Sequence, residues 1–320
     1  CKVGTLLSGG LDSSLITKIA ADLNISKIDA FTLKYDDETN DDLIKAKLLV
    51  SQNDRIRHHL VNVTKRDINI DLIDKVSYHM EELLFDKAYI SIFKNYEAAK
   101  ELNIKAVLNG QGSDEVWLGY YFFYSFMQYK NEMLDIPNFS NYWSNNFFLK
   151  EFSDMKTTNK LILKNLNDNY LPYLGEDKLN SLVGFGIKTH MQSMLMQEDR
   201  LSMASGVECR VPFVDYRIIE LATKIPSNIK VLDGREKFLL RKVGEKMLPR
   251  EIYNRRKEVF PIPPHKYDDL GEKLINTSEV LQSKIIKEIT KIDTKSFNLL
   301  PFNQKWKLFA LSRLENVYFK

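Results

Sequence analysis

The sequence predicts an α/β fold, a doubly wound parallel sheet followed by a mostly helical region. Three observations lead to this fold class. In the first third of the chain, apolar runs typical of buried strands alternate with segments whose apolar residues recur at helical spacing. Two of these runs end in glycine-containing turns that lead directly into helix-like segments. From Tyr120 onward the strand pattern fades, and helix-length segments and aromatic residues dominate.

The alternation predicts parallel pairing, because a strand–helix–strand unit brings the chain back to the edge of the sheet from which it started. The predicted strands are Val3–Leu7, Ile28–Tyr35, Arg57–Val63 and Lys105–Asn109. The predicted helices of this part are Leu11–Asn24, Asp41–Gln52, Ile70–Leu84 and Phe93–Leu102. Further along the chain, helices are predicted near Lys156–Leu166, Lys188–Met203, Ile218–Lys224 and Glu236–Lys246.

The composition excludes several classes of protein. With 320 residues and 44% hydrophobic content, the chain can bury one large core or two smaller ones. A net charge of +3, from 46 basic and 43 acidic residues, argues against a nucleic-acid partner or a membrane surface. No apolar run approaches the roughly 20 residues of a membrane helix. Cys1 and Cys209 form no disulfide framework and no metal-ligand spacing, which indicates a reducing, cytoplasmic compartment.

The first glycine-containing turn has the composition of a phosphate-binding loop. At Ser8-Gly9-Gly10 an apolar strand passes into a helix, whose first N–H groups and dipole attract an anion. The glycines allow close approach of the backbone, and Ser8 and Ser13 supply hydroxyl groups. Asp12 would repel a phosphate unless a divalent cation stood between them, and magnesium takes such a carboxylate together with phosphate oxygens. The alternative is that Asp12 and the serines only cap the helix.

The second glycine-containing turn repeats this pattern. A strand ends in the turn at 109–112, and Ser113, Asp114 and Glu115 then open a helix. Acidic residues in a first turn also stabilise a helix by up to about 1 kcal/mol each, which is the simpler explanation. Both turns, however, follow parallel strands, so they lie at the same edge of the sheet. Asp12 and Asp114 together would hold magnesium better than either alone.

Four motifs, in this order, identify a family resemblance: LLSGGLDSS, LNGQGSDEVWLGY, DRLSMASGVECRVPFVDYRIIELA and GREKFLLRKVGEKMLPREIYNRRKEVFPIP. The first resembles the pyrophosphate loop of the N-type ATP pyrophosphatases, and together they resemble the synthetase domain of the asparagine synthetase family. The resemblance spans nearly all of residues 1–320. It implies a fold of the adenine nucleotide α-hydrolase type, with a nucleotide-binding part at 1–119 and a mostly helical part at 120–320. The stretch KWKLFALSRLENVY is similar to the family's closing helix.

The resemblance also implies an activity. An AMP-forming amide ligase of this family would use ATP and Mg²⁺ to convert aspartate to asparagine through β-aspartyl-AMP. Ammonia would come from glutamine through an upstream glutaminase domain that this chain lacks, and the sequence leaves a homodimer open. One alternative is a related ligase for another carboxylate, similar to β-lactam synthetases or peptide-cyclising enzymes, with the aromatic segment Tyr120–Phe148 shaping the pocket. Another is a non-catalytic nucleotide-binding module.

By resemblance, the site residues fall into three groups. The ATP-binding residues would be Leu6, Ser8, Gly9, Gly10, Asp12, Ser13, Leu33, Asn109 and Gly110. The metal ligands would be Asp12 and Asp114. The catalytic residues would be Lys237, Gln111 and Glu115.

Lys237 would meet the negative charge that grows on the α-phosphate and the departing pyrophosphate. Without the resemblance, Lys237, Arg241 and Lys242 would be interpreted as an ordinary solvated helix face. Gln111 departs from the best-known family members, which carry glutamate there. Glutamine cannot act as a general base, although it can orient a nucleophile through hydrogen bonds.

The motif GVECRVPFVD places charged residues among apolar ones. Charges in such surroundings usually need partners, so Glu208, Arg210 and Asp215 are predicted to form an ion-pair network beside the site, to which Asp199-Arg200 would also belong. Direct contact with the substrate is the alternative.

Overall fold

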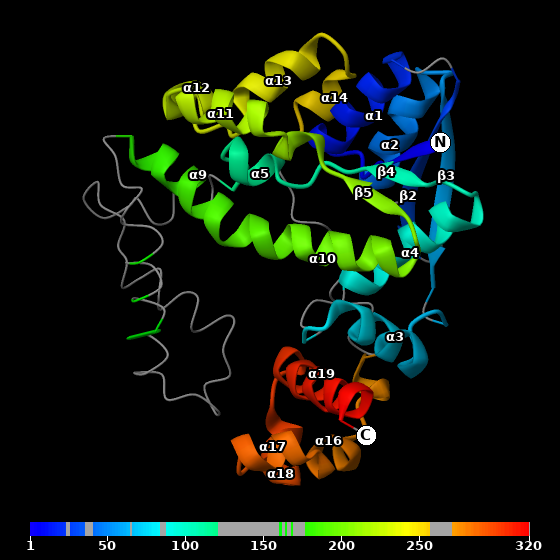
Figure 1. Cartoon of the computed structure of the whole chain (residues 1–320), viewed down its shortest axis with the longest axis vertical. Coiled ribbons are helices and arrows are strands. Elements are labelled where there is room, and N and C mark those ends of the chain that lie inside the picture. Colours follow the sequence, from blue (N-terminus) through cyan, green and yellow to red (C-terminus); the bar gives the residue numbers. More distant parts are fainter. Residues whose placement is uncertain are drawn as a thin grey trace.

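Five parallel strands form the central sheet, in the order β3-β2-β1-β4-β5 (Figure 1). They are β1 (Val3–Leu6), β2 (Ile28–Tyr35), β3 (Ile56–Val63), β4 (Ala106–Leu108) and β5 (Glu208–Arg210). The chain adds β2 and β3 on one side of β1, and then β4 and β5 on the other. In doubly wound sheets, ligands bind beyond the carboxyl ends of the strands where the order reverses. The turns after β1 and β4 therefore lie where this fold places a ligand.

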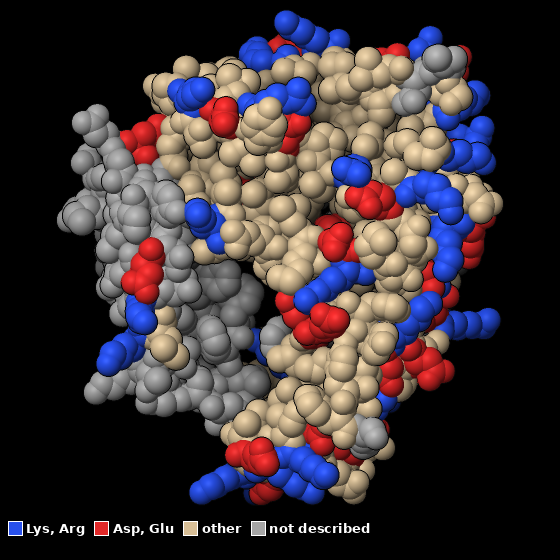
Figure 2. Space-filling model, viewed as in Figure 1, with Lys and Arg blue, Asp and Glu red and all other residues tan. Residues whose placement is uncertain are grey.

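The structure is a computed structural model, and it describes residues 1–23, 26–35, 41–64, 66–83, 88–120, 177–256 and 271–319, with the single residues 160, 161, 164 and 168. Residues 121–148, most of the aromatic segment, lie outside the described residues, as does most of the helix predicted near 156–166. No helix of the described part is both long and apolar enough to cross a membrane. On the face seen in Figure 2, acidic and basic side chains are interspersed.

Helices cover both faces of the sheet (Figure 1). One face carries α1 (Leu11–Leu23) and α2 (Asp41–Ser51). Two further helices, α13 (Phe238–Glu245) and α14 (Arg250–Tyr253), pack against α1. The other face carries α4 (Ala88–Glu101), with α3 (Ile70–Met80) and α10 (His190–Ala204) beside it. Nearly all of β2 is buried, as expected for a strand that is covered on both faces.

The remaining helices are short, apart from α9 and the last one. Between β4 and α13 lie α5 (Ser113–Val116), α9 (Lys178–Lys188), the 3₁₀ turn η2 (Pro212–Val214), α11 (Tyr216–Lys224) and α12 (Ser227–Lys230). The C-terminal group comprises α16 (Thr277–Gln282), α17 (Lys284–Ile289), α18 (Thr294–Leu299) and α19 (Phe302–Tyr318). This group joins the core through α19, whose Arg313 bonds Asp74 of α3 with an Nε–Oδ1 distance of 2.7 Å.

The predicted α/β class and parallel pairing are confirmed. Strand β2 has the predicted bounds. Strands β1 and β3 differ from theirs by one residue at one end, and β4 is one residue shorter than predicted at each end. Helix α3 ends at Met80, earlier than predicted, because Glu81 adopts a left-handed conformation with φ 54°. Strand β5 is not among the predicted elements, since its three residues, Glu-Cys-Arg, form no apolar run. Helix α9 was also missed, and α4 begins five residues before the predicted Phe93.

Candidate active site

The turn after β1 folds back on the start of α1. The Ser8 N–H donates a hydrogen bond to Ser13 Oγ at 3.1 Å, and the two hydroxyl oxygens lie 2.9 Å apart. The Gly10 carbonyl accepts the Ser14 N–H at 3.0 Å, the first hydrogen bond of the helix. The loop therefore has one defined conformation, with the two predicted serines side by side at the helix N-terminus.

Gly9 is the residue that this conformation constrains most. Its φ of +74° lies in the left-handed region, which favours glycine. A Cβ atom at this position would lie 2.3 Å from the Asp42 carbonyl oxygen and 2.9 Å from the Ala46 amide nitrogen. The loop thus packs directly on the backbone of α2, with no space for a side chain.

The turn after β4 lies against the turn after β1. A Cβ atom on Gly110 would lie 3.1 Å from the Asp12 Cβ and 3.2 Å from the Ser13 amide nitrogen. Gly112, the N-cap residue before α5, has φ +85°, and a Cβ atom there would lie 2.3 Å from a Val214 methyl carbon. The two predicted turns therefore meet at the reversal point of the sheet.

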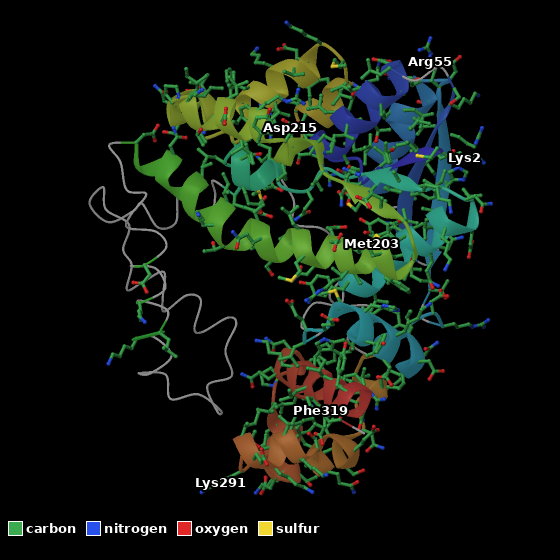
Figure 3. The ribbon with its side chains drawn as sticks, in the orientation of Figure 1. Lys2, Arg55, Met203, Asp215, Lys291 and Phe319 are labelled. Carbon is green, nitrogen blue, oxygen red and sulfur yellow. The ribbon has the colours of Figure 1, made fainter. Side chains whose placement is uncertain are left out.

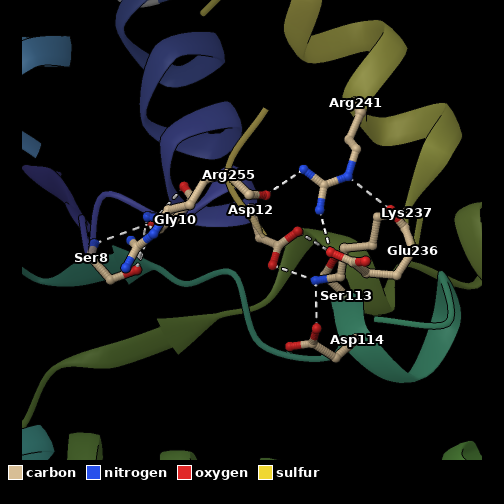
Figure 4. A network of polar contacts seen from close by, with 10 residues as sticks. Ser8, Gly10, Asp12, Ser113, Asp114, Glu236, Lys237, Arg241 and Arg255 are labelled. Carbon is tan, nitrogen blue, oxygen red and sulfur yellow. Dashed lines mark hydrogen bonds and ion pairs between the residues drawn. The ribbon is translucent and has the colours of Figure 1, made fainter. Parts of the chain in front are cut away.

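Lys237 brings the two predicted metal carboxylates together (Figure 4). Its Nζ atom lies 2.5 Å from Asp12 Oδ2 and 2.6 Å from Asp114 Oδ1. The lysine side chain is 2% exposed, and those of Asp12 and Asp114 are 15% and 13% exposed. Ser113 Oγ donates a hydrogen bond to the other Asp12 oxygen, Oδ1, at 2.8 Å. One ammonium ion thus balances part of the charge of two carboxylates at the head of the phosphate loop.

Backbone geometry holds Lys237 at this point. Lys237 precedes α13 with φ 55° and ψ 33°, a left-handed conformation that is uncommon for residues other than glycine. On the opposite side, a Cβ atom on Gly119 would lie 1.9 Å from Asp114 Oδ1 and 2.3 Å from Lys237 Cε. Gly119 was missed by sequence reasoning, and the only available signal is a glycine soon after the second acidic turn.

Arg241, whose structural role the sequence did not reveal, connects the turn before α13 to the segment that follows α13. Its guanidinium group donates to the Glu236 carbonyl at 2.8 Å, to the Glu236 carboxylate, and to the carbonyls of Tyr253 and Arg255. Arg255 in turn pairs with Asp42 of α2, the residue on which Gly9 packs. A buried chain of contacts therefore connects Lys237 to the phosphate loop, rather than the solvated face that the sequence alone suggested.

Replacing Arg241 with methionine is expected to lower the free energy of unfolding by about 3 kcal/mol, because the partly buried Glu236 carboxylate and several carbonyls lose their partner. Urea unfolding of the purified variant measures this loss. The matched control is Lys242→Met on the same helix. The Lys242 side chain is 56% exposed and forms an exposed ion pair with Glu245, so a change within about 0.5 kcal/mol is expected there. Equal effects of the two substitutions would contradict the structural role of Arg241.

Two predicted catalytic residues lie in and beside α5. Gln111 is half-buried between Gly110 and Gly112. Glu115 is buried, and its Oε1 lies 2.8 Å from His190 Nδ1 on α10. Glu115 is thus held by the helical part of the chain, and its direct role in chemistry stays a prediction.

Three predicted nucleotide contacts lie in or directly after strands of the sheet. Leu6 is half-buried at the end of β1, and Leu33 lies within β2 and belongs to the core. Asn109 donates its backbone N–H to the Arg210 carbonyl at 2.8 Å, and its side chain forms a hydrogen bond with buried Glu198. Any contact of these three residues with ATP stays a prediction.

Glu198 is a buried carboxyl group that the sequence did not reveal. Tyr96 of α4 donates its hydroxyl to Glu198 Oε2. Burial raises the pKa of Glu198, although the hydrogen bonds from Tyr96 and Asn109 act in the opposite direction. Burial also raises the pKa of the neighbouring Cys209 thiol to about 12, so this cysteine is not a reactive thiolate.

A second hydrogen-bond chain reaches the phosphate loop from the edge of the sheet. Thr32 Oγ1 donates to the Leu7 carbonyl at 2.6 Å, and His58 Nε2 lies 2.8 Å from the same hydroxyl oxygen. Because a hydroxyl has one proton, the histidine nitrogen must be the donor. Burial, followed by the charges of His59 and Lys47, lowers the pKa of His58 from 6.5 to about 4.

This pKa predicts loss of stability in mild acid. Between pH 6.5 and about 4 the unfolded chain binds a proton at His58 that the folded chain does not, so stability falls as the pH falls through this window. His58→Gln keeps a donor to Thr32 and removes the titration, so its stability should depend less steeply on pH. Urea midpoints at about pH 7 and about pH 5 measure the difference. Identical slopes for both proteins would contradict the buried, neutral histidine.

The predicted ion-pair network around GVECRVPFVD is wrong. Glu208 and Arg210 form an exposed pair with each other at 3.2 Å. Asp215 caps α11 and pairs with Arg217 at 2.8 Å. Arg200 binds Glu81 and Glu82 after α3, and Figure 3 shows Asp215 well separated from Met203, one turn further along α10. Glu208, Arg210 and Asp215 thus pair with neighbours in the chain and Arg200 with residues after α3, and the described residues show no ion pair that joins these groups.

The carboxylates present fit a magnesium ion that arrives with phosphate groups. Magnesium is usually held by one or two carboxylates together with substrate phosphates. Asp12 and Asp114 supply two such groups beside the phosphate loop. Within the described ranges, no group of three or more His, Cys, Asp and Glu side chains could hold a metal without further ligands.

Comparisons with known proteins agree on one family. The family model described as asparagine synthase matches residues 1–298. The glutamine-hydrolyzing asparagine synthetase 3 of Bacillus subtilis is 30% identical over 283 residues, covering 82% of this chain and 45% of the relative. The glutamine-hydrolyzing asparagine synthetase 2 of Lotus japonicus is 29% identical over 320 residues, covering 94% of this chain and 44% of the relative. The chain therefore spans less than half the length of these relatives.

Proposed function

The chain belongs to the asparagine synthase family, whose members use ATP, and from this premise we propose that it is the AMP-forming amide ligase unit of an asparagine synthetase. Residues 1–119 would bind the nucleotide, and 120–320, which also supply β5 and Lys237, would complete the site. The observation that carries the proposal is the position of Lys237 between Asp12 and Asp114 at the head of the phosphate loop.

The first step would be adenylation of a carboxylate. A β-carboxylate oxygen of aspartate attacks the α-phosphorus of ATP, the bond to the bridging oxygen breaks, and pyrophosphate leaves. Backbone N–H groups at the start of α1 and the hydroxyl groups of Ser8 and Ser13 would bind the phosphates, and Lys237 would stabilise the charge that grows on them. Asp12 and Asp114 would hold Mg²⁺, which neutralises phosphate charge when bound.

The second step would form the amide. Ammonia attacks the acyl carbon of β-aspartyl-AMP, loses a proton, and expels AMP. Gln111 lies in the turn at the site and would orient the nucleophile by hydrogen bonding. The longer relatives are named as glutamine-hydrolyzing, so we propose that ammonia comes from a glutaminase domain outside these 320 residues. The chain alone would then use free ammonia.

The relatives' names favour aspartate over another carboxylate as the substrate. Product analysis tests this choice: the protein is incubated with ATP, Mg²⁺, aspartate and ammonium, and AMP, pyrophosphate and asparagine are measured. Equal amounts of the three products are expected. Formation of AMP only with a different carboxylate would overturn the aspartate assignment, and formation of ADP would overturn the reaction type.

A further inference from the structure

The ammonium group of Lys237 occupies the place between the two carboxylates that a bound cation would need. Its Nζ atom lies 2.5 Å from Asp12 Oδ2 and 2.6 Å from Asp114 Oδ1, while Ser113 engages Asp12 Oδ1 at 2.8 Å. Both oxygens of Asp12 are therefore in use. A magnesium ion bridging the same carboxylates would need distances of about 2.0–2.1 Å to their oxygens.

A divalent cation and the ammonium group cannot share this position. At such short range two positive charges repel strongly, and the cation would need oxygens that the lysine already holds. We propose that Lys237 acts as a placeholder: it keeps free divalent cations out of the Asp12–Asp114 pair, so that the site accepts the metal only as a preformed metal–nucleoside triphosphate complex. This inference deepens the proposed function and rests on it.

The phosphate groups of such a complex would provide an alternative anionic partner for the ammonium group of Lys237. Among the described residues, the partners of the ammonium group are the two carboxylates, and removing it would leave two negative charges in a mostly buried place. When phosphates enter, they offer the ammonium group a new anionic partner, and the metal replaces it at the carboxylates. The backbone of Lys237 is fixed before α13, so only the flexible side chain needs to move.

Gly119 lies directly against the Lys237 side chain and the Asp114 carboxylate. A Cβ atom at this position would lie 2.3 Å from Lys237 Cε and 1.9 Å from Asp114 Oδ1. The contact between Lys237 and Asp114 therefore requires that residue 119 has no side chain. The replacement of the ammonium group by the metal at these carboxylates has the same requirement.

Binding of Mn²⁺ without nucleotide, followed by electron paramagnetic resonance of the unbound ion, tests the placeholder role. Wild type is compared with Lys237→Met, with the matched control Lys242→Met, and with the double variant Lys237→Met/Asp114→Asn. We expect Lys237→Met to bind one Mn²⁺ at least about tenfold more tightly than wild type, because a like charge is removed and the carboxylate oxygens become available. The control should behave as wild type, and the double variant should lose the gained binding.

Equal affinities of wild type and Lys237→Met for Mn²⁺, or tighter binding by wild type, would overturn the proposal. If Lys237→Met does not fold, Lys237→Gln replaces it, since the amide keeps a polar donor without the charge. Formation of AMP by the wild-type protein is measured separately. If the wild-type protein forms AMP but also binds free Mn²⁺ tightly, only the placeholder role of Lys237 is contradicted. If the wild-type protein forms no AMP, the proposed function is contradicted.

Discussion

Replacing Lys237 with methionine is expected to lower the rate of AMP formation by about 100- to 1,000-fold, because an oriented positive charge is lost where negative charge develops on the phosphates. Nζ of Lys237 lies within 2.6 Å of both predicted metal carboxylates, beside the phosphate loop. Release of AMP and pyrophosphate under saturating ATP, Mg²⁺ and aspartate measures the effect.

The control for this experiment is Lys242→Met. Lys242 lies on the same helix and carries the same charge, but it is exposed and pairs with Glu245. Its substitution should leave the rate unchanged within about twofold, since exposed pairs contribute little. A folded Lys237→Met protein with nearly wild-type turnover would show that the lysine takes no part in adenylation.

Replacing Gly9 with alanine is expected to abolish ATP binding and to destabilise the fold. The left-handed φ of +74° costs an alanine about 1 kcal/mol. In addition, the new methyl group would meet the Asp42 carbonyl oxygen at 2.3 Å, which forces the loop away from α2 and costs about 1–3 kcal/mol more. Displacement of the loop moves the N–H groups that would bind the phosphates.

Gly206→Ala separates these two contributions. Gly206 has a similar φ of +68°, but a Cβ atom there would meet nothing within 4 Å. The Gly206→Ala variant should therefore lose only the free energy of unfolding that the left-handed φ costs an alanine, and it should keep its affinity for ATP. Urea unfolding and equilibrium binding of a fluorescent ATP analogue measure the two quantities. Similar losses for both variants would mean that the loop does not depend on its packing against α2.

The strand–turn–helix units and the meeting of the two turns could be predicted from the sequence. Strand ends and glycine-containing turns are local signals, and the parallel topology then places the residues after β1 and β4 at one edge. For this reason Asp12 and Asp114 could be paired before any contact was known. The structure adds that one lysine, 225 residues after Asp12, completes the pair.

The rest depends on contacts that no local pattern encodes. Gly119 matters because of the atoms that pack against it. Arg241 matters because three backbone carbonyls, on residues 5 to 14 positions away, accept hydrogen bonds from its guanidinium group. The opposite error occurred at Glu208, Arg210 and Asp215. Their proximity in sequence suggested a shared network, but short exposed elements let each charge pair with a neighbour in the chain.

The central claim is that this site joins a carboxylate to the α-phosphate of ATP, and oxygen-18 transfer tests it most directly. Aspartate labelled with oxygen-18 in its β-carboxylate is incubated with the protein, ATP, Mg²⁺ and ammonium, and the products are analysed by mass spectrometry. We expect one labelled oxygen in the phosphate of AMP and none in pyrophosphate, because the attacking carboxylate oxygen stays with AMP when ammonia displaces it. Asparagine formed together with unlabelled AMP, or together with ADP, would contradict an acyl-adenylate at this site.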